Sequence, residues 1–152
     1  MTQEDKDLLI KDLCARLHYG VKFTLSGDSI YTIKGIDLIV TDEGDWEYAV
    51  TAKGIEPIEI KYIKPYLRPM SSMMQGEWEQ MTALIYPYGR VNRNPENKNE
   101  LLLWLNKEGN DMPISFMDNV FSWLNEHHFD YRGLIERDLA LEAPADMYKY
   151  DE

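Results

Sequence analysis

The sequence predicts an α+β fold: an N-terminal helix, a small curled antiparallel sheet that could close into an SH3-like barrel, and C-terminal helices. Apolar residues near the start of the chain recur with the helical period, whereas over residues 21–63 they alternate with polar ones, as in strands. After residue 70 the helical period returns. Pro65 and Pro69 stand between these parts and disfavour a continuous strand. We therefore expect a helix-and-sheet part over residues 1–70 and a mainly helical part over 71–152, packed as one compact domain.

The first helix is expected to begin after Thr2, whose hydroxyl can accept a hydrogen bond from the first turn, and to end before Gly20. Its apolar stripe is expected to face the core and consists of Leu9, Ile10, Leu13, Cys14 and Leu17. Cys14 is the only cysteine, so no intrachain disulfide forms and the chain needs no oxidising compartment.

The sheet is expected to contain four or five short strands separated by turns near residues 26–28, 42–45 and 52–54. Gly35 lies inside one of these strands and is expected to permit a bulge or a sharp bend. The tryptophans mostly occupy apolar-stripe positions and are interpreted as core residues, with one of them possible at an interface: Trp46, Trp78, Trp104 and Trp123.

Two further helices are predicted in the second half. Ser72, followed by Gln75, and Ser115, followed by Asp118, have the spacing of a helix-capping pair. Residues 87–99 are rich in Asn and Pro and are interpreted as a loop.

The charge of the chain limits the kinds of partner it can bind. Lys and Arg number 16 against 27 Asp and Glu, a net charge of −11, and the second half is the more acidic. This negative charge disfavours binding to nucleic-acid phosphates and to anionic membranes, and it favours binding to a basic protein partner. The acidic start lacks the pattern of a secretory signal, and the longest purely apolar run has five residues, 101–105. We expect a cytoplasmic protein without a membrane segment.

One segment mixes basic and aromatic side chains and is the first candidate binding site: Lys61, Tyr62, Lys64, Tyr66 and Arg68. Such a mixture can stack single-stranded nucleic acid or line a groove for a peptide. In the alternative interpretation the tyrosines pack in the core while the cations face water. A second candidate contact surface is the start of the polar loop, with Tyr86, Tyr88 and Arg90.

His127, His128 and Asp130 form the one cluster that could support a metal-assisted hydrolase. Adjacent histidines on a helix point about 100° apart and seldom share one ion, so a polar helix end is the alternative. No nucleophile elbow or glycine-rich phosphate loop occurs. We therefore predict no metal, cofactor or catalytic residue. The main hypothesis is a non-enzymatic accessory protein that acts by protein–protein contact, with its acidic C-terminal half against a basic surface. A nucleic-acid-binding module on residues 61–68 is the alternative.

Three stretches resemble a family of small proteins of unassigned activity encoded by gut Bacteroides, their phages and integrated mobile elements. They are MTQEDKDLLIKDLCARL with YGVKF at residues 1–17 and 19–23, IKPYLRPMSSM at 63–73, and WLNEHHFDYRGLI with LEAP at 123–135 and 141–144. The resemblance implies a bacterial cytoplasm and an accessory role in a phage or mobile element. It supplies no catalytic residue or cofactor.

Overall fold

The computed structural model describes residues 1–25, 29–85 and 114–148, and these divide into two compact units. Unit 1 consists of Met1–Leu67 with Arg132–Glu152, and unit 2 of Arg68–Tyr131. The division at residue 67 lies close to the one expected near residue 70. The last segment of the chain, however, belongs to unit 1 and not to the helical part that precedes it.

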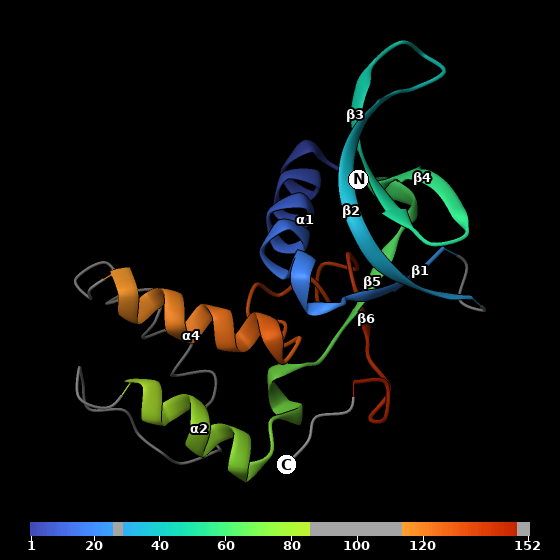
Figure 1. The fold of residues 1–152 in the computed structure, drawn as a ribbon. Helices are drawn as coiled ribbons and strands as arrows, with labels where there is room; N and C mark the ends of the chain where they lie inside the picture. The colour runs from blue at the N-terminus through green and yellow to red at the C-terminus, as the bar shows by residue number, and fades with distance from the viewer. Residues whose placement is uncertain (26–28, 86–113, 149–152) are drawn as a thin grey trace. The chain divides into compact units, whose positions relative to one another are not determined.

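Unit 1 combines a helix with one sheet, as Figure 1 shows. Helix α1 (Gln3–Arg16) is followed by the short 3-10 helix η1 (Leu17–Tyr19). The strands are β1 (Lys22–Thr24), β2 (Ile30–Val40), β3 (Trp46–Ala52), β4 (Ile55–Glu59), β5 (Lys64–Leu67) and β6 (Leu141–Glu142), with the 3-10 helix η2 (Ile60–Tyr62) before β5. Their order in the sheet is β4-β3-β2-β1-β5-β6, and every pair is antiparallel except β5 with β6. The predicted α+β class and antiparallel sheet are confirmed. The sheet stays open, so the SH3-like closure does not form within the described chain.

Helix α1 begins as predicted, and four residues of its predicted stripe face the core: Leu9 and Leu13 are buried, and Ile10 and Leu17 pack against the core partly buried. Thr2 and Asp5 form a capping box, in which each side chain accepts a hydrogen bond from the other residue's backbone N–H. The buried positions are Leu9, Asp12, Leu13 and Arg16, whereas Cys14 is exposed. The prediction for Cys14 was wrong because a paired Asp12 and Arg16 can enter the core. Their entry turns the buried stripe of the helix away from Cys14.

Gly35 marks a bend in the long strand β2, as predicted. The register of β2 with β3 shifts between Ile33 and Gly35 and then runs without interruption from Gly35↔Thr51 to Val40↔Trp46. A Cβ atom on Gly35 would lie only 2.9 Å from Thr51 Oγ1, so glycine allows the two strands to approach closely. Beyond the bend, β2 and β3 form a two-stranded hairpin that extends past the rest of the sheet (Figure 1).

The core of unit 1 joins residues from both ends of the chain. The Ala143 N–H donates to the Leu67 carbonyl oxygen at 2.7 Å, continuing the parallel pairing of Tyr66 with Leu141. Twelve buried residues form one cluster: Leu9, Leu13, Val21, Phe23, Ile33, Val50, Ile60, Ile63, Leu67, Leu134, Leu139 and Ala140. The C-terminal segment is therefore part of this core.

Unit 2 contains the 3-10 helix η3 (Met70–Ser72) and helices α2 (Gln75–Ile85) and α4 (Ile114–Glu126). Both helices were predicted, but not their caps. Helix α2 begins at Gln75, where the Glu77 carboxylate accepts the Met74 N–H at 2.9 Å, while the Ser72 hydroxyl donates to the Pro69 carbonyl oxygen. Helix α4 begins one residue before Ser115. The core of the unit contains Met70, Met73, Trp78, Met81, Val120, Leu124 and Phe129.

Among the described residues, no helix has the length and apolar character needed to cross a lipid bilayer.

Candidate interaction surface

The predicted basic and aromatic segment does not present a single surface. Lys61 and Tyr62 lie in η2, where both are exposed and the Lys61 ammonium sits 4.9 Å from the centre of the Tyr62 ring. Lys61 also forms an ion pair with Glu59 at 2.9 Å. In β5, Lys64 pairs with Asp138, and Tyr66 is buried.

Arg68, the last residue of this segment, is held inside unit 2. Its guanidinium donates two hydrogen bonds to the Glu77 carboxylate, at 2.8 and 2.9 Å, and lies 4.2 Å from the centre of the Phe129 ring. Burial alone would raise the pKa of Glu77, but the hydrogen bonds from Arg68 and from the Met74 N–H outweigh it and lower that pKa. All three predicted cations thus have carboxylate partners. Glu59 is a local neighbour of Lys61, whereas Asp138 and Glu77 lie farther along the chain from Lys64 and Arg68 and could not be assigned from local sequence.

The second candidate surface, with Tyr86, Tyr88 and Arg90, lies outside the described residues.

The histidine cluster lies where helix α4 ends. The His127 ring stacks on Trp123 with ring centres 4.0 Å apart, and its Nδ1 lies 2.9 Å from the Trp123 carbonyl oxygen. His128 is buried and has φ of +60°, and Asp130 is buried with its N–H donating to the Arg68 carbonyl oxygen. Within the described residues, no three ligating side chains gather in a way that could hold a metal ion.

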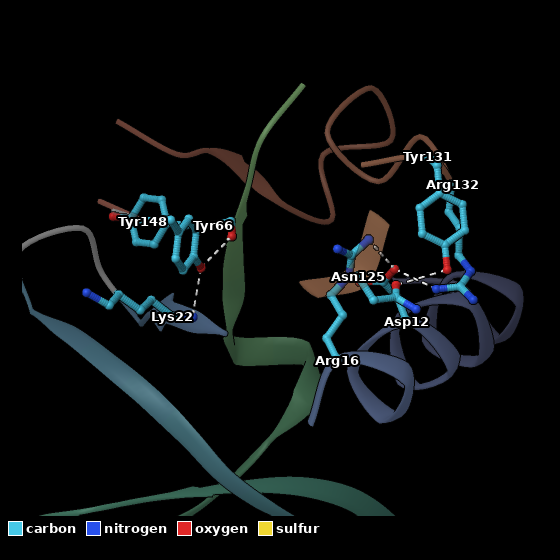
Figure 2. Close-up of polar contacts among 8 residues, drawn as sticks. All are labelled: Asp12, Arg16, Lys22, Tyr66, Asn125, Tyr131, Arg132 and Tyr148. Atoms are coloured by element: carbon cyan, nitrogen blue, oxygen red, sulfur yellow. Dashed lines mark hydrogen bonds and ion pairs between the residues drawn. The ribbon is translucent and has the colours of Figure 1, made fainter. Parts of the chain in front are cut away.

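Unit 1 contains a second kind of polar centre, at a buried aspartate (Figure 2). Asp12 accepts hydrogen bonds from Arg16, at 2.8 and 3.0 Å, and from Arg132 at 2.8 Å. Both Asp12 and Arg16 are fully buried, and Arg132 is mostly so. This network fastens the C-terminal segment to helix α1, and we assign it a structural role.

The surface that the sequence interpretation missed is the hairpin of β2 and β3. Leu38 pairs with Tyr48 and Val40 with Trp46, so these four side chains share one face of the hairpin. Their exposed fractions are 53%, 43%, 54% and 70%, respectively. We call this set the apolar ladder. Exposed apolar patches of this kind mark contact sites in many soluble proteins.

The apolar ladder continues the face of the sheet that enters the core. Ile36 and Val50, the next pair on the same face, belong to the core of unit 1, with Val50 fully buried. Trp46, interpreted as a core residue, is instead the most exposed large apolar side chain of the described chain. The alternation in the sequence correctly predicted that Trp46, Tyr48 and Val50 lie on one face of the sheet. It did not predict that the core ends at Val50.

The hairpin is also acidic. Between Lys34 and Lys53 the chain has no Lys or Arg, but it has Asp37, Asp42, Glu43, Asp45 and Glu47. Asp42, Glu43 and Asp45 are exposed in the turn that joins the two strands. An apolar face bordered by carboxylates is therefore the combination that this part of the molecule presents to a partner.

Comparison of the chain with protein-family models, with curated proteins and with solved structures found no match.

Proposed function

We propose that this is a non-enzymatic accessory protein that acts in the bacterial cytoplasm by binding another protein, and that the apolar ladder is its contact surface. The observation that carries the proposal is the gathering of Leu38, Val40, Trp46 and Tyr48, all exposed, on one face of a protruding hairpin. The phage or mobile-element context remains what the resemblance implies.

The residue types support a binding role. Tryptophan and tyrosine are enriched at protein interfaces and dominate the binding energy where they are buried by a partner. Burying a large apolar side chain contributes about 1.5–3 kcal/mol. The sequence suggested the acidic second half as the binding region, but many of its residues lie outside the described chain, so the hairpin carries the proposal.

The nucleic-acid alternative has less support. It needs Lys61, Lys64 and Arg68 to meet phosphates, and each of these side chains already pairs with a carboxylate of the same chain.

The proposal can be tested by site-specific photo-crosslinking in Bacteroides cells. A photoreactive amino acid at position 48 is expected to give a defined adduct that is lost in a Trp46→Ser background. Position 74 is the matched control, because Met74 is exposed by 55% and lies in unit 2. Once the adduct is identified by mass spectrometry, the purified partner should bind the Trp46→Ser/Tyr48→Ser variant at least about thirtyfold more weakly than the wild type. Equal crosslinking at both positions, or unchanged affinity of the double variant, would contradict the proposal.

A further inference from the structure

We infer that the partner of the apolar ladder is a cationic amphipathic segment of another protein, with apolar side chains that cover the ladder and Lys or Arg beside them. This inference rests on the proposed function, because it specifies the chemistry of the partner at the same surface.

The turn of the hairpin presents three carboxylates next to the ladder. Asp42, Glu43 and Asp45 are exposed, and among the described residues none of them has a cationic partner. The turn itself is ordered by backbone bonds: the Thr41 N–H donates to the Asp45 carbonyl oxygen at 2.8 Å, and the Gly44 N–H to the Thr41 carbonyl oxygen at 2.9 Å. The carboxylates thus stand at a fixed end of the ladder, in the turn between Val40 and Trp46.

The opposite face of the hairpin is already engaged. Glu47 alternates with Trp46 and Tyr48 and therefore points away from the ladder. Its carboxylate pairs with Lys6 of helix α1. This ion pair joins the face opposite the ladder to helix α1, whereas the ladder side chains themselves stay exposed.

Charge argues for a basic partner over the other occupants of such a face. A second copy would bring two sets of turn carboxylates together on a chain whose net charge is −11, and like charges at a contact oppose association. An anionic membrane would be repelled in the same way, although Trp and Tyr are common at membrane interfaces. Lys and Arg beside apolar residues would instead gain attraction from the turn while the apolar residues cover the ladder.

The test is a selection from a random peptide library displayed on phage, carried out on the full chain. Parallel selections on the Trp46→Ser/Tyr48→Ser variant remove peptides that bind elsewhere. Peptides that depend on Trp46 and Tyr48 are expected to be enriched in Lys and Arg interspersed with apolar residues. Their affinity should fall about tenfold in the variant Asp42→Asn/Glu43→Gln/Asp45→Asn, and it should weaken further as salt is added.

A matched control variant has the same net charge as this triple variant, but its three substitutions lie outside the hairpin. Glu56, Glu136 and Asp146 are exposed acids outside the hairpin, so Glu56→Gln/Glu136→Gln/Asp146→Asn should leave the affinity within about twofold of the wild type. An equal loss in both triple variants would overturn the inference, because the effect would then come from net charge alone.

The outcomes separate this inference from the proposed function. Peptides that need Trp46 and Tyr48 but show no enrichment in basic residues would overturn the inference and leave the proposed function standing. If no selected peptide depends on these two residues, both ideas fail. Sedimentation of the protein alone gives a further check: a dimer that disappears on Trp46→Ser/Tyr48→Ser would identify a second copy as the occupant and overturn the inference.

Discussion

The side-chain hydroxyl of Tyr148 donates a hydrogen bond to the backbone carbonyl oxygen of Tyr66 at 2.9 Å (Figure 2). The hydroxyl oxygen of Tyr148 in turn accepts a hydrogen bond from the backbone N–H of Lys22, also at 2.9 Å. Strands β1 and β5 pair Phe23 with Pro65 and Thr24 with Lys64, so Lys22 and Tyr66 are the next positions in this register. The Tyr148 hydroxyl thus lies between the Lys22 N–H and the Tyr66 carbonyl oxygen, which would otherwise bond directly. It extends the hydrogen bonding between β1 and β5 by one position.

Replacing Tyr148 with Phe should therefore destabilise unit 1 by about 1–2 kcal/mol, because two backbone groups lose their partner. The loss is measurable by urea unfolding. The matched control is Tyr62→Phe, since the Tyr62 side chain is exposed in the same unit. A Tyr148→Phe variant as stable as the wild type would show that water replaces the hydroxyl without cost.

The same tyrosine should make stability depend on pH in the alkaline range. Burial raises the pKa of Tyr148 from 10.0 to about 12. The folded state thus favours the protonated phenol. The stabilisation of unit 1 that results is complete below about pH 10 and is lost as the pH rises toward 12. The wild type should lose stability over this interval more steeply than Tyr148→Phe. The free energy of unfolding is measured in urea at several pH values between 10 and 12. An equal loss of this free energy in both proteins would contradict the prediction.

Asp12 should be the most sensitive charged position of unit 1. The Asp12→Ala substitution leaves Arg16 and Arg132 without the carboxylate that they share, and it should cost about 3–5 kcal/mol. Asp7→Ala is the control in the same helix, because Asp7 is exposed and should change stability by no more than about 0.5 kcal/mol. Thermal unfolding of both variants distinguishes a buried network from a general effect of charge on helix α1.

Glu77 should make unit 2 sensitive to acid. Its pKa is lowered from 4.5, so the folded state favours the carboxylate. The contribution of this carboxylate to the stability of unit 2 is present above pH 4.5. It is lost as the pH falls through the lower pKa that Glu77 has in the folded state. Glu77→Gln should cost about 1.5–3 kcal/mol at neutral pH, and its difference from the wild type should shrink as the pH falls below 4.5. Fluorescence of Trp78, which is fully buried in unit 2, can follow the unfolding. A difference that stays constant with pH would contradict the role given to the ion pair with Arg68.

The bend of β2 depends on the missing side chain at Gly35. In Gly35→Ala the new Cβ would lie 2.9 Å from Thr51 Oγ1, and the strain should cost about 1–3 kcal/mol. Adding Thr51→Ala removes that oxygen and should restore part of the stability. Gly76→Ala is the control, because nothing lies within 4 Å of the corresponding position in helix α2, and alanine there should be neutral or stabilising by up to about 1 kcal/mol. Thermal unfolding of the three variants and the wild type measures these differences, and no recovery in the double variant would exclude the steric explanation.

Local patterns in the sequence determined the class of the fold and most of its elements. The capping hydroxyl of Thr2, the left-handed backbone at Gly20, the bend at Gly35 and the alternation of Trp46, Tyr48 and Val50 were all predictable, because each depends on neighbours within a few residues. Helices α2 and α4 of unit 2 were also predictable from their period, although their first residues were not.

Only the tertiary structure decided which faces are covered and which charges are paired. Asp12 is buried because Arg132, 120 residues later, reaches it, and Arg68 is occupied because Glu77 and Phe129 surround it. Trp46 and Val50 belong to the same alternating face, yet one is exposed and the other buried, since the hairpin extends beyond the core. The physical reason is common to all three cases. Periodicity tells which side chains point the same way, whereas burial and ion pairing depend on what another part of the chain places opposite them.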